Sequence, residues 1–590
     1  MSRSTHTSAR QLLLALSLTL LASLLPAGST AAVPDAPAAP APSPAARPAT
    51  LHVATTGRDS ARGSSAAPLR SIRAAVSRAR SGDRIVVHGG VYHEEIEIPE
   101  GKRLSLRNAR GSRVWLEGSR LVKGWRKEGE GYVHDGWRAE FDSSPTYHWG
   151  APDNEAESWS FLNRAHPMAA HPDQIWVGSR ELRQVASLAG LRPGTFFVDD
   201  ARDRLHVGTD PRGRSVRASE LAKAMSIRSR RTSVRGIGVR RFAPSVPHMG
   251  AVTVEAPGVT LRDLRIEGNA TTGLHVSARN ATLARLVLAG NGMLGAGATY
   301  ADGLRINGLR VRGNNTERFN YSPVAGGIKV DRTRGIRVRN SVLSRNAGTG
   351  LWLDESSYDI RVTDSSMRDN LHHGLALEIS AKAVVADTVI EGNTDDGIKV
   401  NDTSDVQLWN NTVVGNGRPI NIVQDDRDPA DDDTEGRDPR QPRPDRTMPW
   451  INGPVEVHNN ILSARSGNCL LCVEDYSGRF TAEELRVRAA GNVYHRRDRR
   501  SPSWAVVWSR ASRDPAVYES LRGFRAATGQ ERRSLELVGV PAVTGSLRAS
   551  KRVASRARAI AVLLPPRLAR VLGRGTGQRH LGAWVGQAHA

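Results

Sequence analysis

Apolar and polar residues alternate in short segments through the middle of the chain, and this period of two predicts strands rather than helices. A column of Asn residues accompanies the segments, at positions 269, 291, 314, 346, 370, 393 and 416, in steps of 22, 23, 32, 24, 23 and 23 residues. After each Asn come a short turn, usually with Gly, and in most cases a four-residue strand such as Gly327-Ile-Lys-Val. A repeat of this length predicts a parallel β-helix, in which each coil buries its inward residues only by stacking on its neighbours.

The Asn column has a structural explanation. Asn tolerates left-handed backbone at a corner and can stack on the Asn of the coils above and below. We therefore expect these residues to hold the corners of the coils together, and not to bind a ligand.

The N-terminal segment carries a family resemblance. Leu51-His-Val-Ala-Thr-Thr-Gly and, further on, Ser81-Gly-Asp-Arg-Ile-Val-Val-His precede the repeats. Together with the repeats, they resemble secreted right-handed parallel β-helix proteins of the pectin-lyase-like superfamily. The resemblance implies an all-β fold, a single right-handed solenoid of roughly ten coils, with residues 71–80 as an amphipathic helix that caps the open end. It implies no particular reaction, because this fold hosts lyases, hydrolases, epimerases and adhesins.

The chain divides into six segments by composition and period. Residues 1–32 are expected to be a secretory signal peptide, because Arg3 and Arg10 precede an apolar run from Leu12 to Leu25 and small residues follow. The run is too short to span a membrane, so we expect a secreted, extracellular protein without a membrane anchor. The other segments are an Ala/Pro linker (33–50), the N-terminal cap and first coils (51–122), an insertion (123–216), the main repeats (217–500) and a C-terminal cap (501–590).

The insertion and the C-terminal segment both lack the repeat. Residues 123–216 contain ordinary strand patterns such as Gly194-Thr-Phe-Phe-Val. They predict a small inserted β-domain, similar to the one inserted in family-120 β-xylosidases. The C-terminal cap is expected to contain a strand over 535–540 and an Arg-rich helix around 549–572. Residues 425–446, rich in Asp, Pro and Arg, predict a solvated loop between coils.

The charge is strongly positive but spread along the chain. Lys and Arg number 83 against 60 Asp and Glu, a net charge of +23, and the basic residues form no long block. This pattern favours a diffusely basic surface and no nucleic-acid partner. Long-range attraction to an acidic polymer, such as a uronic-acid polysaccharide, is the alternative. We expect a monomer.

Candidate chemistry lies on the outward face of the repeated strands. In Gly-x1-x2-x3-x4 the residues x2 and x4 point outward on one face. Down the coils, x2 is His275, Arg305, Lys329, Trp352, Ala376 and Lys399, and x4 is Ser277, Asn307, Asp331, Asp354, Glu378 and Asn401. Three stacked carboxylates destabilise a fold, so we interpret them as a site in which mutual repulsion separates their pKa values.

The spacing of these carboxylates fits sugar chemistry. Adjacent rungs place Asp354 and Glu378 about 5 Å apart, as in retaining glycosidases, and two rungs separate Asp331 from Glu378 by about 9.6 Å, nearer the inverting range. Trp-x-Asp followed by Glu 24 residues later is similar to family-120 enzymes, which implies Asp354 as nucleophile and Glu378 as acid/base.

Six further residues are expected to contact a polysaccharide or oligosaccharide substrate. They are Lys329, Trp352, Lys399, Asn401, His372 and His373. Trp352 offers an aromatic platform for a sugar ring. The two histidines at the turn before Glu378 either line the cleft or face solvent.

Two other activities stay open beside a glycoside hydrolase. A polysaccharide lyase would hold Ca²⁺ on Asp331, Asp354 and Glu378 and use Lys329 or Lys399 as base. The flanking acids raise rather than lower a lysine pKa, so the hydrolase, which needs no metal or cofactor, is favoured. A non-catalytic carbohydrate-binding or adhesin role is the third possibility.

Cys469 and Cys472 form the single C-x-x-C motif of the chain. One such pair supplies too few ligands for a tetrahedral zinc site. In an exported protein we expect a local disulfide between them.

Overall fold

The computed structural model describes residues 47–156, 159–432 and 434–584. The expected signal peptide (1–32) and most of the expected linker (33–50) lie outside the described residues. The chain separates into a unit Met1–Arg47 and a compact unit Pro48–Ala590, and only the second is considered below. Among the described residues, no helix is both long and apolar enough to cross a membrane.

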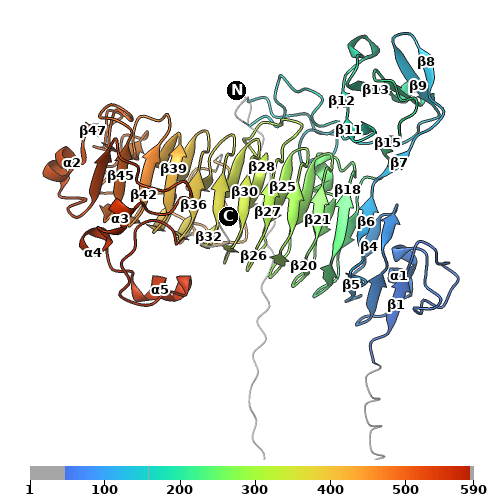
Figure 1. Ribbon diagram of the computed structural model, residues 1–590, viewed down its shortest axis with the longest axis horizontal. Helices are drawn as coiled ribbons and strands as arrows, with labels where there is room; N and C mark the ends of the chain where they lie inside the picture. The colour runs from blue at the N-terminus through green and yellow to red at the C-terminus, as the bar shows by residue number, and fades with distance from the viewer. Residues whose placement is uncertain (1–46, 157–158, 433, 585–590) are drawn as a thin grey trace, which may run out of the picture. The chain divides into compact units, whose positions relative to one another are not determined.

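Three long sheets, each of 13 strands, make up most of the described structure. Each coil contributes one strand to each sheet in turn (Figure 1). Sheet A contains β1 (Thr50–Val53), β2 (Arg84–Val87), β5 (Ser105–Asn108), β17 (Ser233–Arg235), β20 (Thr260–Arg262), β23 (Thr282–Ala284), β26 (Arg305–Asn307), β29 (Arg337–Arg339), β32 (Tyr358–Thr363), β35 (Ala381–Ala386), β38 (Ser404–Trp409), β41 (Val455–His458) and β44 (Val487–Ala490).

Sheet B contains β3 (Gly90–Tyr92), β6 (Val114–Glu117), β18 (Ile237–Arg240), β21 (Arg265–Glu267), β24 (Val287–Ala289), β27 (Arg310–Arg312), β30 (Val342–Ser344), β33 (Ser366–Arg368), β36 (Val389–Glu391), β39 (Thr412–Asn416), β42 (Ile461–Ala464), β45 (Val493–Arg496) and β48 (Leu535–Val538).

Sheet C contains β4 (Ile96–Ile98), β16 (Met225–Ile227), β19 (Val252–Val254), β22 (Thr272–Val276), β25 (Leu294–Thr299), β28 (Gly326–Asp331), β31 (Thr349–Asp354), β34 (Leu375–Glu378), β37 (Asp396–Asn401), β40 (Arg418–Gln424), β43 (Leu471–Asp475), β46 (Val506–Trp508) and β47 (Ala516–Tyr518). All neighbours in the three sheets pair in parallel except β46 and β47, which are antiparallel. The all-β parallel β-helix is thus confirmed, with somewhat more coils than the expected ten.

The core lies inside the coils, between the three sheets. Alternate residues of each strand face inward and are almost fully buried, as Ile328, Val330, Leu351 and Leu353 show on two successive strands of sheet C. One apolar cluster runs from Val53 to Phe524 through every coil. Burial therefore depends on stacking, because no coil encloses these side chains alone.

The predicted Asn column is a continuous ladder of buried amides at the corner between sheets B and C. Each Asn from 269 to 393 donates from Nδ2 to Oδ1 of the next over 2.8–2.9 Å, and all seven are at most 1% exposed. The same Oδ1 also accepts from the backbone N–H of the preceding Asn, as between Asn314 and Asn346. The ladder satisfies the buried corner groups and aligns the coils.

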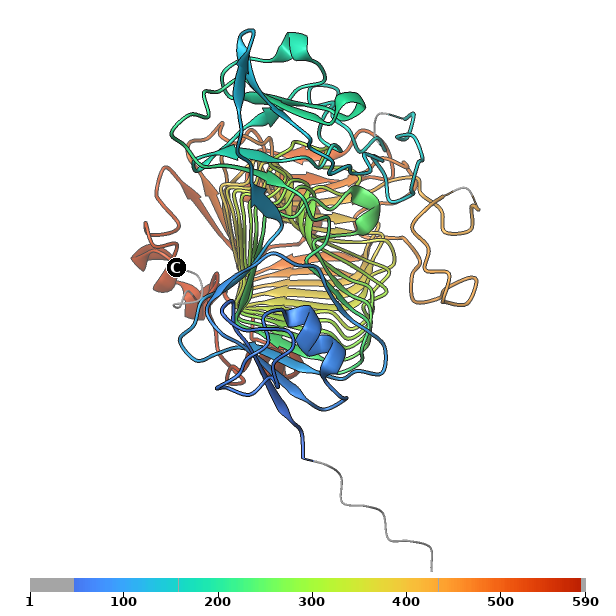
Figure 2. The same cartoon turned by 90° about the vertical axis from the view of Figure 1, so that its right-hand side faces the viewer.

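Helix α1 (Ile72–Arg78) covers the N-terminal end of the stack, as expected (Figure 2). Its N-cap Ser71 accepts from the backbone N–H of Ala74. The buried carboxylate of Glu94 accepts from the first two helical N–H groups, those of Ile72 and Arg73, at 2.9 Å each. The helix is therefore anchored to the first coil through its N-terminus.

The insertion forms two small sheets between β6 and β16. One contains β7 (Ser119–Leu121), β10 (Ile175–Val177), β11 (Arg180–Glu181) and β15 (Val216–Ser219), and the other β8 (Arg126–Glu128), β9 (Gly131–Asp135), β12 (Arg183–Gln184), β13 (Thr195–Asp199) and β14 (Arg204–Val207). Short 3₁₀ helices span Leu188–Gly190 (η1), Asp200–Arg202 (η2) and, in the coils, Val246–His248 (η3). A separate apolar cluster that includes Trp137 and Phe196 fills the insertion.

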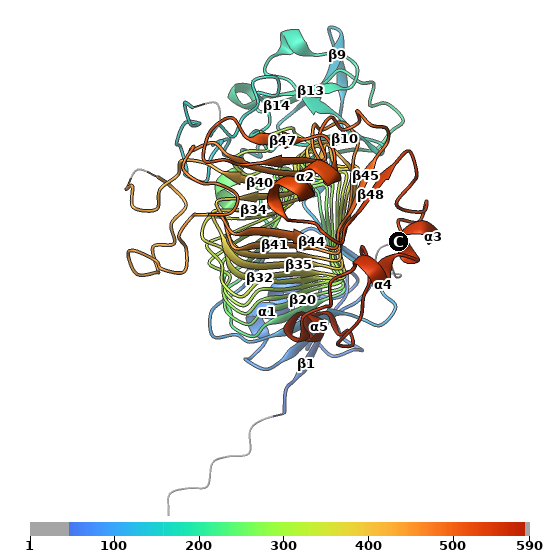
Figure 3. The same cartoon turned by 90° about the vertical axis from the view of Figure 1, so that its left-hand side faces the viewer.

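The C-terminal segment differs from the expectation. The helix expected around 549–572 is three short helices, α3 (Lys551–Ala554), α4 (Ala557–Ile560) and α5 (Pro566–Leu572), and Pro565 and Pro566 separate α5 from α4. They pack along the sides of the coils, for example Leu568 near Trp409, and do not cover the end. The open end is covered by α2 (Leu521–Thr528), whose Leu521 and Phe524 join the main core (Figure 3).

We predict that the amide ladder is a major source of stability. Asn346→Ala would leave the buried backbone N–H of Asn314 without a partner, and would remove one of the two bonds made by Asn314 Nδ2 and one of the two accepted by Asn370 Oδ1. At about 1–3 kcal/mol for the unsatisfied group and about 1 kcal/mol for each further lost hydrogen bond, the free energy of unfolding should fall by about 3 kcal/mol or more. Chemical denaturation would measure this, with the exposed Asn307→Ala as control; equal losses in both variants would contradict the prediction.

The disulfide gives a second prediction. Cys469 and Cys472 are bonded to each other and fully buried, with no free cysteine among the described residues. Protein purified from the culture medium, unfolded without reductant, should therefore react with no thiol reagent. Two reactive thiols in that assay would show that the exported chain is reduced.

Candidate functional site

The three predicted carboxylates lie on the outer face of sheet C. Asp331 of β28 pairs in register with Asp354 of β31, and Glu378 of β34 with Asn401 of β37. In the register of β31 and β34, Trp352 lies opposite Ala376. Two residues further along the same strands, Asp354 therefore lies beside Glu378. Asp331, Asp354 and Glu378 thus occupy consecutive rungs, as the alternation predicts.

One coil was assigned to the wrong sheet from the sequence. Arg305 and Asn307 belong to β26 in sheet A, so they are not part of the outward column. The strand that pairs with β28 is β25, so Gly297 lies opposite Lys329 and Thr299 opposite Asp331, at the positions expected for Arg305 and Asn307. The error arose because strands of different sheets share the same Gly-Leu-x-Ile alternation.

Lys329 is the cation at the centre of the column. Its Nζ lies 2.8 Å from Oδ2 of Asp354, 3.8 Å from Oε1 of Glu355 and 4.2 Å from the ring centre of Trp352. Burial alone would lower the pKa of Lys329, but the carboxylates of Asp354, Glu355 and Asp331 outweigh burial and raise it above its usual value. Lys329 therefore stays charged, and its ammonium group is in direct contact with the carboxylate of Asp354.

Asp331 has a different environment. Burial, with a further contribution from Glu355, raises its pKa to about 7, against the opposing effect of Lys329. Its Oδ1 is buried without a hydrogen-bond partner. The phenol of Tyr147, from the insertion, has a pKa raised by burial and by Asp331, which places the insertion against this end of the column.

Glu378 is held from two sides. Its Oε2 accepts from Nε1 of Trp352 at 3.1 Å, and its Oε1 lies 3.0 Å from Nη2 of Arg427. Arg427 is itself paired with Asp402 and Asp425 at 3.0 and 2.9 Å. These contacts leave Glu378 oriented along the face of sheet C, toward Trp352.

Sequence reasoning missed Arg427, because it lies in the segment interpreted as a solvated loop. Burial raises the pKa of Asp402 to about 8, and Asp425 reinforces the shift through their shared hydrogen bond, so Asp402 holds a proton at neutral pH. Arg427 is thus paired with the neutral carboxyl group of Asp402 and with the ionised carboxylate of Asp425. The sequence signal that could have indicated an ion-paired arginine is a basic residue directly after two acids, in Asp425-Asp426-Arg427.

The remaining predicted residues lie on β37, beside β34, or in the turn before β34. Asn401 donates to Oδ2 of Asp425 at 3.0 Å, and Lys399 lies in register between Ala376 and Asn421. His372 Nδ1 lies 2.6 Å from Oδ2 of Asp395. Asn401 thus lies beside Glu378, whereas His372 lies at the opposite end of β34. The roles of these residues in substrate binding stay predictions.

Possible metal ligands lie together at the turn before β34. His373 Nδ1 lies 3.4 Å from Oδ2 of Asp396, and burial and nearby positive charges hold the pKa of His373 well below its usual value. His372, His373 and Asp395 bring one ligand atom each within 4.8 Å of the others. The carboxylate column fits calcium poorly, because Lys329 and Arg427 already neutralise Asp354 and Glu378.

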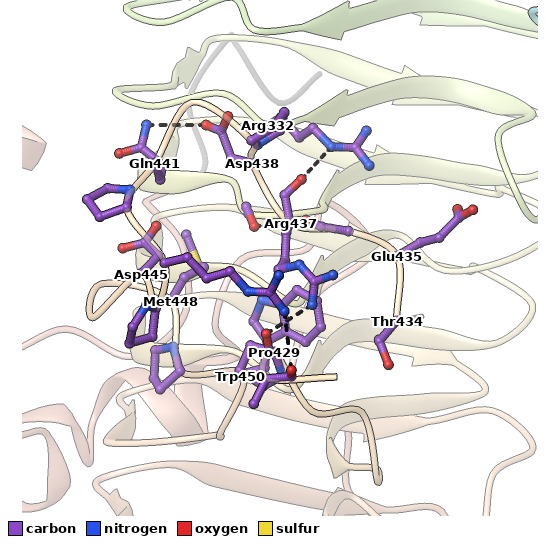
Figure 4. A pocket seen from close by; sticks show the side chains of 18 of the residues that line it. Arg332, Pro429, Thr434, Glu435, Arg437, Asp438, Gln441, Asp445, Met448 and Trp450 are labelled. Carbon is purple, nitrogen blue, oxygen red and sulfur yellow. Dashed lines mark hydrogen bonds between the residues drawn. The ribbon is translucent and has the colours of Figure 1, made fainter. Parts of the chain in front are cut away.

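A large cavity of about 800 Å³ adjoins the site but contains none of the predicted residues (Figure 4). It is enclosed mainly by residues 429–450, which leave the coil between β40 and β41. Arg332 connects it to the column, since it pairs with Glu355 at 2.5 Å and donates to the backbone oxygen of Arg437 at 2.9 Å. Residues 425–446 form a loop between β40 and β41, as expected, and most of its described residues are exposed. Asp438 within it is buried, and so is Trp450, which follows the segment.

Comparisons with known proteins agree with this architecture. The family model described as the right handed beta helix region matches residues 250–418. A solved structure of XylC with xylose is 16% identical, with a TM-score of 0.55 over 76% of this chain and 83% of that chain. The pectate lyase Pel9A is 13% identical, with a TM-score of 0.34 over 72% and 77% of the two chains. No curated protein sequence matches this chain. The family model and the similarity to XylC agree with a right-handed parallel β-helix fold.

The raised pKa of Asp331 predicts a pH dependence of stability. Because its pKa of about 7 exceeds that of an unfolded Asp, about 3.9, the folded protein binds more protons between these values. The contribution of Asp331 to the free energy of unfolding is therefore fully present below about pH 4 and is lost as the pH rises to about 7. Asp331→Asn should remove that loss, so the free energy of unfolding of the variant, relative to the wild type, should rise over this range.

Guanidinium denaturation at a series of pH values would measure the difference. The exposed Asp405→Asn serves as control. A difference between Asp331→Asn and wild type that does not change with pH would show that Asp331 is ionised throughout.

Proposed function

We propose that the protein is an exported glycoside hydrolase, with its active site on the outer face of sheet C. The observation that carries the proposal is the row of Asp331, Asp354 and Glu378 on consecutive rungs beside Lys329 and Trp352. A fold stacks like charges at this spacing only at a cost in stability, and the partners of each carboxyl group differ. The similarity to XylC with xylose makes carbohydrate the first ligand class to test.

Asp354 is the proposed nucleophile. Its Oδ2 lies 2.8 Å from Nζ of Lys329, and the backbone N–H of Glu355 donates to its Oδ1 at 2.8 Å. In the first step an Asp354 oxygen bonds to the anomeric carbon as the bond from that carbon to the leaving oxygen breaks. A neighbour one rung away, about 5 Å, is at the separation that retaining enzymes use.

Glu378 is the proposed acid/base, following the family-120 resemblance. Protonated, it gives its proton to the leaving oxygen; as a carboxylate, it then takes a proton from the water that releases the sugar. Arg427 and Nε1 of Trp352 each hold one of its oxygens, which orients the group toward the platform of Trp352. In this scheme Asp331 is a third acid that affects the pKa values of the site.

The lyase alternative finds less support. A lyase base must lose its proton near neutral pH, whereas the pKa of Lys329 is raised by its acidic neighbours. A non-catalytic carbohydrate-binding role is the remaining proposal. The next experiment would indicate it if the site variants change no activity.

The catalytic pair gives a direct test. Asp354→Asn and Glu378→Gln should each reduce kcat/KM on the best natural glycan by about 100-fold or more, since each removes a group that acts in the transition state. On aryl glycosides with good leaving groups, Glu378→Gln should lose less, because such groups need little protonation. Release of reducing ends, with and without a chelator, is the measurement.

Glu391→Gln, an outward acid of sheet B, is the matched control and should keep full activity. Full activity of both site variants would refute the site. An unsaturated product absorbing in the ultraviolet would instead identify a lyase.

A further inference from the structure

Three potential metal ligands meet at the corner where sheet B passes into sheet C. Among the described residues, His372, His373 and Asp395 are the one group of three His, Cys, Asp or Glu side chains whose ligand atoms all lie within 4.8 Å of one another. The two histidines belong to the turn before β34, and Asp395 belongs to the turn before β37. This corner lies at the opposite end of β34 from Glu378, so the proposed acid/base is not part of it.

The repeat explains why these residues come together. His372 follows the ladder residue Asn370 by two positions. Asp395 follows Asn393 by the same interval, so the two side chains occupy the same place on successive coils. Asn370 donates to Oδ1 of Asn393 at 2.8 Å, and the backbone N–H of Asp395 donates to the carbonyl oxygen of His372 at 3.4 Å. These bonds hold the two turns about 4.8 Å apart, one step of the sheet, before any ion binds.

The neighbouring coils confine this arrangement to two turns. The corresponding position is Gly348 one coil earlier and Arg418 one coil later. A glycine has no side-chain ligand, and an arginine carries only donors and a positive charge. The possible ligands are therefore limited to the turns before β34 and β37.

The charges at this corner leave one acid free to face a cation. Besides the histidines, the charged groups are the carboxylates of Asp395, Asp396 and Glu474 and the cations of Lys399 and Arg418. Arg418 lies 2.9 Å from Asp396 and 3.0 Å from Glu474, so these two acids balance its charge. Asp395 is the remaining acid, and its side chain is 41% exposed, which gives an ion access from solvent.

His372 has a ring nitrogen without a hydrogen-bond partner. Its Nδ1 is buried and makes no hydrogen bond, although Oδ2 of Asp395 lies 2.6 Å away. The ring of Tyr321 lies against the imidazole, with ring centres 3.4 Å apart, and limits its rotation. A buried polar atom without a partner is costly, and an ion bound by both Nδ1 and the carboxylate oxygen would remove that cost.

His373 is arranged as metal-bound histidines commonly are. Its Nδ1 accepts from the backbone N–H of Asp396 at 3.3 Å and lies 3.4 Å from Oδ2 of the same residue, which leaves Nε2 for an ion. Asp396 is in turn held by Arg418 at 2.9 Å and by Asn421 at 3.1 Å. Binding would move the ring proton from Nε2 to Nδ1, where Oδ2 of Asp396 accepts it, and such an anchored carboxylate orients a ligating imidazole.

The ligand set indicates the class of ion. Two imidazole nitrogens and one carboxylate oxygen suit Zn²⁺ and its first-row neighbours, whereas Ca²⁺ and Mg²⁺ prefer oxygen alone. Zinc bonds of about 2.0–2.2 Å place tetrahedral ligand atoms about 3.3–3.6 Å apart. The 2.6 Å contact between His372 and Asp395 would therefore open by about 1 Å on binding, a change that an exposed Asp side chain can make.

We propose that His372, His373 and Asp395 form a binding site for a divalent first-row transition ion of the zinc class, with water as the fourth ligand. The ion joins the turns of two successive coils. It occupies the two histidines that the sequence suggests for substrate contact, and no step proposed at Asp354 and Glu378 passes through it.

Titration with Zn²⁺ is the test, on the exported chain without a histidine tag, treated with a chelator and then desalted. Calorimetry should show one Zn²⁺ bound per chain with a Kd of about 1 µM or below, and Ca²⁺ or Mg²⁺ should not compete. Zn²⁺ should raise the Tm, because the ion binds the folded chain. Co²⁺ in its place should give the visible absorption of a four-coordinate ion.

Variants then assign the ligands. His372→Ala and Asp395→Ala should each weaken Zn²⁺ binding by about 100-fold or more, since each removes a ligand. Asp396→Asn removes only the charge that orients the buried imidazole and should weaken binding about tenfold. His93→Ala is the matched control, because His93 lies 2.8 Å from Glu220 in a pair without a third ligand in the described structure, and it should bind as the wild type does.

Circular dichroism and a cooperative thermal transition would show that each variant is folded. If His372→Ala does not fold, the exposed Asp395→Ala decides. The site is refuted if the wild type binds no Zn²⁺, if the folded ligand variants bind it as tightly as the wild type, or if His93→Ala weakens binding as much as they do.

Discussion

The buried amide ladder at the corner between sheets B and C sets the register on which the rest of the molecule depends. Each Asn bonds the side chain and the backbone of its neighbour, so the coils cannot slide past one another without losing buried hydrogen bonds. Because strand side chains alternate with period two, a slip of one residue would turn every outward group inward. The ladder stands just before the sheet C strands, and it therefore keeps Asp331, Asp354 and Glu378 on one face.

Placing three acids on one face creates an electrostatic problem, and the structure resolves it differently for each. Asp354 is paired with Lys329, Glu378 is paired with Arg427, and Asp331 is half-buried with a pKa of about 7. Lys329 belongs to a strand of sheet C, whereas Arg427 belongs to the long loop between β40 and β41. The three carboxyl groups thus have different partners although they occupy equivalent positions in the repeat, and different environments are the usual condition for acid and base chemistry in one site.

The segments that interrupt the repeat supply most of the side chains around the outer face of sheet C. The insertion brings Tyr147 toward Asp331 and Trp149 to the turn before β19. Residues 425–450 carry Arg427 and enclose the adjoining cavity. A solenoid presents a regular, open surface, so additions of this kind are where a common architecture acquires a particular site.

The sequence by itself determined the solenoid and the position of its outward column, because both follow from periods of two and about 23 residues that local pattern reveals. It also indicated the capping helix, from the apolar face of residues 72–79, and the Asn ladder. It misplaced Arg305 and Asn307, since the same short motif recurs in different sheets. Only the tertiary structure decided that Arg427 holds Glu378, that Tyr147 lies near Asp331, and that the C-terminal helices run back along the coils. Those contacts join residues with no fixed spacing along the chain, and packing alone brings them together.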